Sequence, residues 1–193
     1  MPEHTLWGAP VTPFVSAVVT AQVAIEPWQL RAYFALRHAI FVEEQRMFDG
    51  SDVDEHDLAA TPIVVHGHAA GMPDEVIGAV RIYPADGATW YGGRLGVCQA
   101  YRSRKVVGTA LIFAAVSTAH ARGCTRFLAT VQEGNVGYFE RHCFFSIRSV
   151  DVCGRPHRLM EADLAAYPPR IADPLQPVDG AYAIAELQKR RAA

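Results

Sequence analysis

The chain has 193 residues, half of them hydrophobic, and a formal net charge of −2 at pH 7. This length is enough to bury the core of one domain, and the near-balanced charge gives no sign of nucleic acid or an anionic membrane as a partner. No stretch is typical of a signal peptide, and the apolar run over residues 14–25 is too short to span a bilayer, so we expect a cytoplasmic protein. The 4 cysteines lack the spacing of a zinc site, and we expect no bound metal.

The beginning of the chain predicts an irregular arm, a strand and a helix. Several prolines oppose regular structure in residues 1–13. Val18–Ile25 is rich in β-branched residues and predicts a strand, and Glu26-Pro27 is typical of a helix start. An apolar stripe at helical spacing continues from there to Phe41.

Acidic side chains gather in the stretch that follows, at Glu43, Glu44, Asp49, Asp52, Asp54, Glu55 and Asp57. Such a run is usually a solvated loop. It is also suited to bind a cationic group such as a substrate amine, for which Asp52 and Asp54 are the candidates. A metal site is a third interpretation, but the run lacks the glycine and the spacing of an EF-hand loop. The first two interpretations remain open.

Two further strands are predicted over residues 61–67 and 75–83, and they are expected to pair as an antiparallel hairpin. The turn after them carries Trp90 and Tyr91. Aromatic residues in such a turn belong to a core more often than to a ligand site. Trp90 and Tyr91 nevertheless stay candidates for the substrate pocket, because they lie next to the strand proposed to bind a ligand, and Arg81 in the second strand is a further candidate.

The next segment, Arg94–Gly123, combines a short strand, a basic turn and a helix. Leu95 and Val97 share one face of the strand, and the turn Tyr101–Lys105 contains three cationic side chains. One face of the helix is apolar, with Leu111, Ala114, Ala115 and Thr118. The first N–H groups of a helix lack intrahelical partners and attract phosphate, so the turn is suited to bind an anion. An ordinary exposed basic turn is the alternative.

After this helix, residues 124–131 predict a buried strand, and the succession of strand, helix and strand implies a parallel pair. A short helix near residues 136–142 and a hairpin over residues 145–163 follow. Prolines then interrupt regular structure before a final helix over residues 182–191, which we expect on the surface or against a partner subunit. The chain is therefore divided into an arm (1–13), a domain (14–165) and a tail (166–193).

Three stretches resemble the GNAT N-acyltransferase superfamily. The strand Arg94–Val97, the basic turn and Gly108-Thr109 are similar to the family's pyrophosphate-binding motif. Residues 36–45, LRHAIFVEEQ, resemble its first helical region, closest to the nitrogen-starvation N-acetyltransferase subgroup. Asn135 and the short helix after it resemble the second signature of the family.

Four positions depart from the family pattern. Ser103 stands where the leading Arg or Gln of the turn is expected, and Cys143 replaces the usual glycine of the second signature. Val106 stands where the first glycine of the turn is expected. Phe139 stands where many members have a tyrosine that acts as a general acid, with Tyr138 beside it.

The resemblance implies an α/β (α+β) fold, with a mixed, mostly antiparallel twisted sheet flanked by helices and a parallel strand pair that splays apart. It also implies acetyl-CoA as the cosubstrate, admitted between the splayed strands. The residues that it assigns to the cosubstrate are Leu95, Val97, Arg102, Arg104, Lys105, Val106, Val107, Gly108, Thr109, Asn135 and Tyr138.

The implied reaction is direct attack of a primary amine of a small molecule on acetyl-CoA, catalysed by the protein alone or as a homodimer. Glu43 and Glu44 are candidates for the base, with His56 and Glu133 as further ones, and Tyr138 is the candidate for the acid. Two other functions stay open. One is an enzyme with a longer acyl donor, of the acyl-homoserine-lactone synthase or N-acyl amino acid synthase kind. The other is a CoA-binding regulatory module without catalysis.

Overall fold

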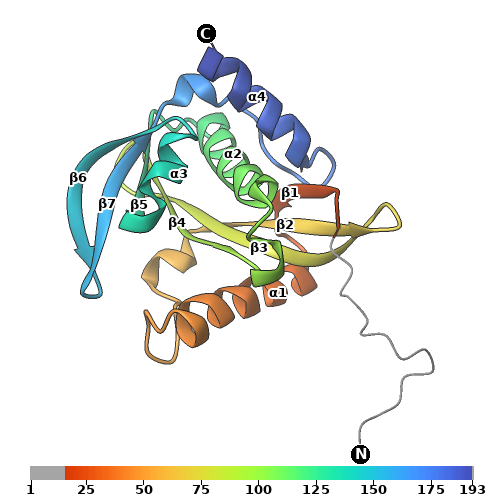
Figure 1. Cartoon of the computed structure of the whole chain (residues 1–193), viewed down its shortest axis with the longest axis horizontal. Coiled ribbons are helices and arrows are strands. Elements are labelled where there is room, and N and C mark those ends of the chain that lie inside the picture. The colour runs from red at the N-terminus through yellow and green to blue at the C-terminus, as the bar shows by residue number, and fades with distance from the viewer. Residues whose placement is uncertain (1–15, 193) are drawn as a thin grey trace, which may run out of the picture.

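The computed structural model describes residues 16–192, which fold around an eight-stranded sheet with helices on both faces (Figure 1). The strands are β1 (Val19–Val23), β2 (Thr61–Ala69), β3 (Met72–Pro84), β4 (Thr89–Val97), β5 (Arg126–Gln132), β6 (Phe144–Val152), β7 (Arg155–Ala162) and β8 (Val178–Asp179). The helices are α1 (Pro27–His38), α2 (Lys105–Ala121), α3 (Val136–Glu140) and α4 (Gly180–Ala192). Short helical segments are η1 (Ala39–Glu44), η2 (Glu55–Leu58), η3 (Gln99–Tyr101), η4 (Glu133–Asn135) and η5 (Leu164–Ala166). The predicted arm over residues 1–13 lies outside the described residues.

The strand order is β6-β7-β5-β4-β3-β2-β1-β8. Every neighbouring pair is antiparallel except β4 and β5, which α2 connects as parallel strands. This pair is short: it runs from Thr89 opposite Arg126 to Gly92 opposite Ala129. Beyond it β4 stays with β3 and β5 stays with β7, so the two strands diverge. The predicted mixed, mostly antiparallel sheet with a splayed parallel pair is confirmed.

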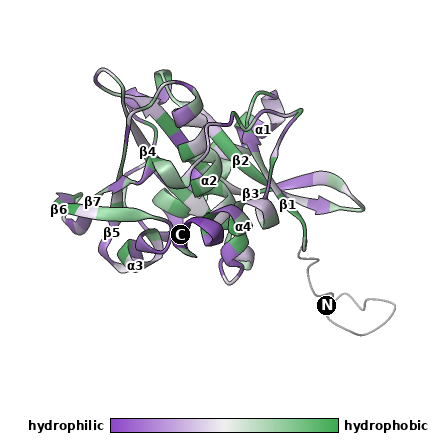
Figure 2. Ribbon diagram, turned by 90° about the horizontal axis from the view of Figure 1, so that it is seen from above, coloured by the Kyte–Doolittle hydropathy of each residue, from purple (hydrophilic) through white to green (hydrophobic). Residues whose placement is uncertain are grey.

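Helix α2 forms the centre of the core. The sequence predicts a single buried face, but every residue from Val107 to Ala119 is buried. The reason is that α2 lies between the sheet on one side and α4 on the other (Figure 1). Figure 2 shows its apolar ribbon in the middle of the molecule. The longest of the described helices has 17 residues, and none of those in residues 16–192 is long and apolar enough to cross a membrane.

Helix α1 covers the opposite face of the sheet (Figure 1). Its Tyr33 packs with Ala24, Val64 and Ala79 in a second, smaller cluster. The helix begins as the sequence predicts, with Pro27 at its first position and a capping box between Glu26 and Gln29. It continues without a break into the π-helical turn η1, a feature that is frequent at functional sites.

The C-terminal residues belong to the same fold. Strand β8 extends the sheet beside β1, and α4 packs on α2 with Ala183 and Leu187 buried. The prolines between Tyr167 and Val178 break regular structure and predict a separate tail over residues 166–193. Those prolines interrupt only the regular structure. The residues before and after them, such as Tyr167 and Val178, are buried in the core.

We predict that α4 is needed for stability. Leu187 is 4% exposed, and we expect Leu187→Ala to lower the free energy of unfolding by about 2–5 kcal/mol, since it leaves a cavity between α4 and α2. Leu175 is 93% exposed, so the matched Leu175→Ala variant should change it by less than about 0.5 kcal/mol. Chemical denaturation measures both values, and equal stabilities would contradict a packing role for α4.

Candidate functional site

A cavity of about 440 Å³ lies where β4 and β5 diverge, with a different lining on each face of the sheet. Successive side chains of a strand point to opposite faces, so each strand contributes alternate residues to each half. On the α2 side the lining is apolar: Ile112, Ala115, Val116, Phe127, Ala129, Val131, Phe139 and Phe144. On the α1 side it is mostly polar and aromatic: Gln45, Met47, Phe48, Asp54, His56, Arg81, Tyr83, Tyr91, Arg94, Gln132 and His157.

Aromatic rings stack along one wall of the polar half. The ring of His56 stacks on Tyr83 at 4.5 Å between centroids, and Tyr83 stacks on Tyr91 at 5.9 Å. Tyr83 and Tyr91 are paired residues of β3 and β4, which places both rings on the same face. Trp90 points to the other face and packs against the main core. Of the two turn aromatics considered from the sequence, it is therefore Tyr91 that lines the cavity.

Strand β4 contains a bulge beside the cavity. Ala79 lies opposite Gly96 and Arg81 opposite Gly93, so Val80 alone faces two residues, Arg94 and Leu95. Arg94 has a φ of +53°, which non-glycine residues rarely adopt. Bulges of this kind redirect the backbone and are frequent next to active sites.

The turn η1 packs tightly against the end of β4. A Cβ atom at Gly96 would lie 2.8 Å from Cδ1 of Ile40, so a larger residue here would require the end of the Ile40 side chain to shift. The same π-helical turn buries Phe41 and directs it to the cavity. Gly96 therefore lies in close contact with η1, next to the bulge.

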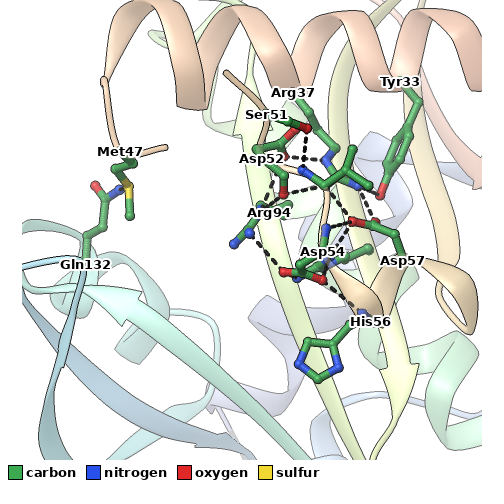
Figure 3. Close-up of polar contacts among 12 residues, drawn as sticks. Tyr33, Arg37, Met47, Ser51, Asp52, Asp54, His56, Asp57, Arg94 and Gln132 are labelled. Atoms are coloured by element: carbon green, nitrogen blue, oxygen red, sulfur yellow. Dashed lines mark hydrogen bonds and ion pairs between the residues drawn. The ribbon is translucent and has the colours of Figure 1, made fainter. Parts of the chain in front are cut away.

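The acidic loop, residues 49–57, is held by a buried ion network (Figure 3). Arg37 at the end of α1 is fully buried, and its Nε donates to Asp52 Oδ2 at 2.7 Å. Its two terminal nitrogens donate to the carboxylate of Asp57 at 2.6 and 3.0 Å, and one of them also donates to the Tyr33 hydroxyl at 2.9 Å. Burial raises the pKa of Tyr33 to about 12, so this phenol stays protonated while it accepts from Arg37.

Arg81 of β3 and Arg94 of the bulge complete the network. Arg81 donates to both oxygens of Asp54 at 2.7 and 2.6 Å and to Asp57 at 2.7 Å. Arg94 donates to Asp54 at 3.0 Å and to the backbone oxygen of Asp52 at 3.0 Å. Its guanidinium also lies 4.1 Å from the ring centre of Phe48, a cation–π contact.

This pairing corrects the picture of a free acidic patch. The three carboxylates of Asp52, Asp54 and Asp57 face three guanidinium groups, and hydrogen bonds from Arg81 hold the pKa of Asp54 below its usual value. Asp52 is buried and already paired, so it is neither a solvated residue nor an open amine ligand. Asp54, 34% exposed, lines the cavity together with Arg81.

Residues 45–48, the bridging segment, connect η1 to the acidic loop across the polar half of the cavity. Gln132 of β5 donates to the side-chain oxygen of Gln45 at 2.9 Å and lies 3.4 Å from the sulfur of Met47. Arg155 of the β6–β7 hairpin donates to the backbone oxygen of Gln45 at 2.7 Å. Figure 3 shows Met47 and Gln132 facing each other, away from the ion network. The segment thus joins the α1 side of the molecule to β5 and the hairpin.

The N-terminus of α2 keeps the features expected of an anion site only in part. Its N-cap residue Arg104 makes no side-chain capping bond, and Lys105 is exposed. Arg102 binds Glu44 through two hydrogen bonds of 2.6 Å and donates to the backbone oxygen of Val97 at 2.9 Å. Arg104 donates to the backbone oxygen of Ser16. Lys105 is therefore the cation of this turn that is most open to a ligand.

Gly108 and Thr109 have structural partners. A Cβ atom at Gly108 would lie 2.6 Å from the Tyr138 hydroxyl, so the glycine makes room for this side chain. Thr109 is buried and lies 2.9 Å from Nε2 of His142. Val107 is part of the core, and Val106 packs beside Gly180. Of the residues assigned to the cosubstrate, Leu95 and Asn135 line the cavity.

The three catalytic candidates from the sequence lie outside the cavity lining. Glu43 is exposed and lies 3.6 Å from His38, and Glu44 is engaged by Arg102. The Tyr138 hydroxyl donates to the backbone oxygen of Lys105 at 3.2 Å, and burial raises its pKa. Phe139 enters the cavity in its place, so α3 presents a ring without a hydroxyl.

Sequence reasoning missed several lining residues, among them Tyr83, Arg94, Gln132 and His157. Arg94 and Tyr83 stand in segments that were predicted as strands, where one face is expected to reach a site. His157 and Gln132 are paired residues of β7 and β5, and only the register of the sheet brings them together. Among the described residues, no group of three or more His, Cys, Asp or Glu side chains has a geometry that could hold a metal ion.

The family model "Acetyltransferase (GNAT) family" matches residues 23–144, well over half of the chain. The chain belongs to this family. It is an acyltransferase, and the matched residues include β4, the basic turn, α2, β5 and α3. No match was found among curated protein sequences.

Solved structures share the GNAT fold. A Lactobacillus plantarum protein assigned as an N-acetyltransferase is 25% identical with a TM-score of 0.66, over 76% of this chain and 98% of that one. Escherichia coli ElaA is 24% identical with a TM-score of 0.61, over 76% and 99%. BjaI, a CoA-dependent acyl-homoserine lactone synthase, is 18% identical with a TM-score of 0.60, over 77% and 84%. The latter two likenesses show the fold alone.

We predict that the GNAT site depends on Arg37 for its stability. Arg37→Met leaves Asp52 and Asp57 without their main partner, and we expect the free energy of unfolding to fall by about 3–5 kcal/mol. Arg102→Met removes an exposed pair with Glu44 and should change stability little. Denaturation curves for both variants provide the comparison, and a stable Arg37→Met protein would show that the network is dispensable for folding.

The network also predicts loss of stability in acid. Burial opposes ionisation of Asp57, but hydrogen bonds from Arg37 and from the Asp54 N–H outweigh it and lower its pKa from 3.8 to about 2. A lowered carboxyl pKa stabilises the fold above the unfolded value, and this contribution is lost as the pH falls through the folded value. As the pH falls from 3.8 to about 2, the free energy of unfolding of the wild type should therefore decrease by about 2 kcal/mol more than that of Asp57→Asn.

The control for this comparison is Asp74→Asn, which removes an exposed carboxylate. The free energy of unfolding of Asp74→Asn should change with pH as that of the wild type does. If Asp57→Asn followed the wild type as well, the ion pair of Asp57 with Arg37 would not be the source of acid sensitivity.

Proposed function

We propose that this protein transfers the acetyl group of acetyl-CoA to the primary amine of a small molecule. One observation carries the proposal: the cavity between β4 and β5 is apolar on the α2 face and polar on the α1 face. An acyl group and an amine acceptor can therefore meet in the gap from opposite faces. Direct attack needs the two reactants to be held together in one orientation, and a gap that is open to both faces can hold them in this way.

The open edge of β4 supports binding of the donor. From Gly93 to Val97 the strand has no partner on its β5 side, so its backbone groups on that edge are available to the amides of pantetheine. A peptide-like group binds such an edge as an added strand does. The pyrophosphate would lie at the N-terminus of α2, where the uncapped N–H groups and Lys105 offer positive charge.

The bulge supports the chemistry. In the proposed step the amine nitrogen bonds to the thioester carbon, the C–S bond breaks, and CoA leaves as the thiolate. A backbone N–H near Leu95–Val97 would stabilise the negative charge that develops on the carbonyl oxygen. The amine must lose a proton and the thiolate must gain one. Phe139 has no hydroxyl and cannot donate a proton to the thiolate. The polar half of the cavity is where groups for proton transfer are found.

A longer acyl donor is the second candidate, and the apolar half of the cavity favours it. At least eight apolar side chains line this half, which is more surface than an acetyl group covers. BjaI, which has the same fold, is an acyl-homoserine lactone synthase solved with isopentyl-CoA. An enzyme that acylates an amino-acid-derived amine with a longer chain is therefore the alternative.

A donor series tests both candidates. We would titrate CoA and desulfo-CoA calorimetrically, and then measure thiol release from acetyl-, butyryl-, hexanoyl- and octanoyl-CoA with a panel of primary amines. Ala115→Leu fills the apolar half, and Ala121→Leu, at the exposed end of α2, is its matched control. We expect Ala115→Leu to lower kcat/KM for octanoyl-CoA at least tenfold and to leave acetyl-CoA turnover within about threefold.

Turnover that is highest with acetyl-CoA would support acetyl transfer. A preference for hexanoyl- or octanoyl-CoA that Ala115→Leu abolishes would support the second candidate. Binding of CoA without turnover of any donor would indicate a regulatory module. Absence of CoA binding at millimolar ligand would contradict the assignment of the gap to the donor.

A further inference from the structure

We propose that His157 is the general base that takes the proton of the attacking amine. This inference rests on the proposed acyl transfer and names a residue for a step that GNAT membership leaves open. His157 lies on β7, one strand away from the gap, and it lines the cavity.

The register of the sheet places His157 on the acceptor side. It lies directly opposite Gln132 of β5, and residues opposite each other in an antiparallel pair share a face. Gln132 contacts the bridging segment, which covers the polar half of the cavity. The imidazole of His157 is therefore on the face where the amine would approach.

The hydrogen bonding of His157 fixes which nitrogen is basic. Its Nδ1 lies 2.8 Å from the backbone oxygen of Arg155, and a carbonyl oxygen only accepts, so Nδ1 carries the proton. In a neutral imidazole Nε2 then holds the lone pair. Within residues 16–192 no hydrogen bond of this nitrogen is found, and His157 is one of the residues that line the cavity. A buried histidine of the cavity lining thus keeps an acceptor nitrogen that no group of the described chain occupies.

Other titratable groups fit the role less well. Glu43 and Glu44 lie outside the cavity, and Glu133 is paired with Arg158. Asp54 lines the cavity, but Arg81 and Arg94 hold it as a paired carboxylate. His56 is exposed and stacks on Tyr83, and nothing in the described chain fixes its tautomer.

The step balances without a further reactant. The amine nitrogen bonds to the thioester carbon and the C–S bond breaks. His157 Nε2 takes the proton that the nitrogen loses, and the departing thiolate of CoA takes one from water. The imidazolium then returns its proton to solvent, which restores the neutral Nδ1–H form.

The test uses variants that keep the local fold. His157→Asn retains an N–H near the position of Nδ1, so the bond to Arg155 is preserved while the basic nitrogen is removed. We expect kcat to fall about 10²–10⁴-fold with the Kd for CoA unchanged. His120→Asn is the matched control, since His120 also places Nδ1 at 2.7 Å from a backbone oxygen, that of Tyr167, but lies outside the cavity lining. Added imidazole should restore turnover in His157→Ala and not in an equally inactive fold variant.

The outcomes distinguish a failure of His157 as the base from a failure of the proposed acyl transfer. A wild type that acylates no amine would overturn the proposed function, and the base with it. A wild type that acylates amines, with His157→Asn within threefold of it, would overturn the base and leave the function intact. The ¹⁵N chemical shifts of the histidine rings, measured by NMR, report the tautomer and do not depend on turnover. We expect His157 in the Nδ1–H form, and the Nε2–H form would contradict the proposal.

Discussion

A fully buried guanidinium group is tolerated only when its charge and its donors are matched, and that requirement at Arg37 organises the α1 side of this protein. Asp52 and Asp57 satisfy it, and they come from a loop with little regular structure of its own. Once these two residues are fixed, Asp54 between them is placed against Arg81 and Arg94. One buried cation thus fixes the wall of the cavity and the side chain of the bulge residue in β4.

On the other side, the cavity exists because the parallel pairing of β4 and β5 ends after Gly92 and Ala129. Each strand keeps its second neighbour, so the sheet stays continuous on both sides while the gap opens between them. The core beneath is held by α2, which α4 covers from outside. The gap therefore opens onto one side of α2, and α4 covers the opposite side.

The order of elements, the parallel pair and the central helix could be predicted from sequence, because each depends on local patterns of apolar residues and turns. The pairing of the acidic loop could not, since its arginine partners come from α1, β3 and β4. Gly108 illustrates the same limit: glycine in a basic turn suggests space for a phosphate, whereas the space is filled by Tyr138. His157 was missed because only the pairing of β5 with β7 brings it to the cavity.

The loop between α1 and β2 is anchored unequally along its length. The part near Asp52–Asp57 is tied down by buried charges, whereas the bridging segment is held by a few hydrogen bonds from Gln132 and Arg155. Breaking a buried ion pair costs about 3–5 kcal/mol, and a typical hydrogen bond contributes only about 1 kcal/mol net. Under destabilising conditions the bridging segment is therefore expected to separate from β5 and the hairpin before the Asp52–Asp57 part separates from α1 and β3. The two ends of one loop thus differ in local stability.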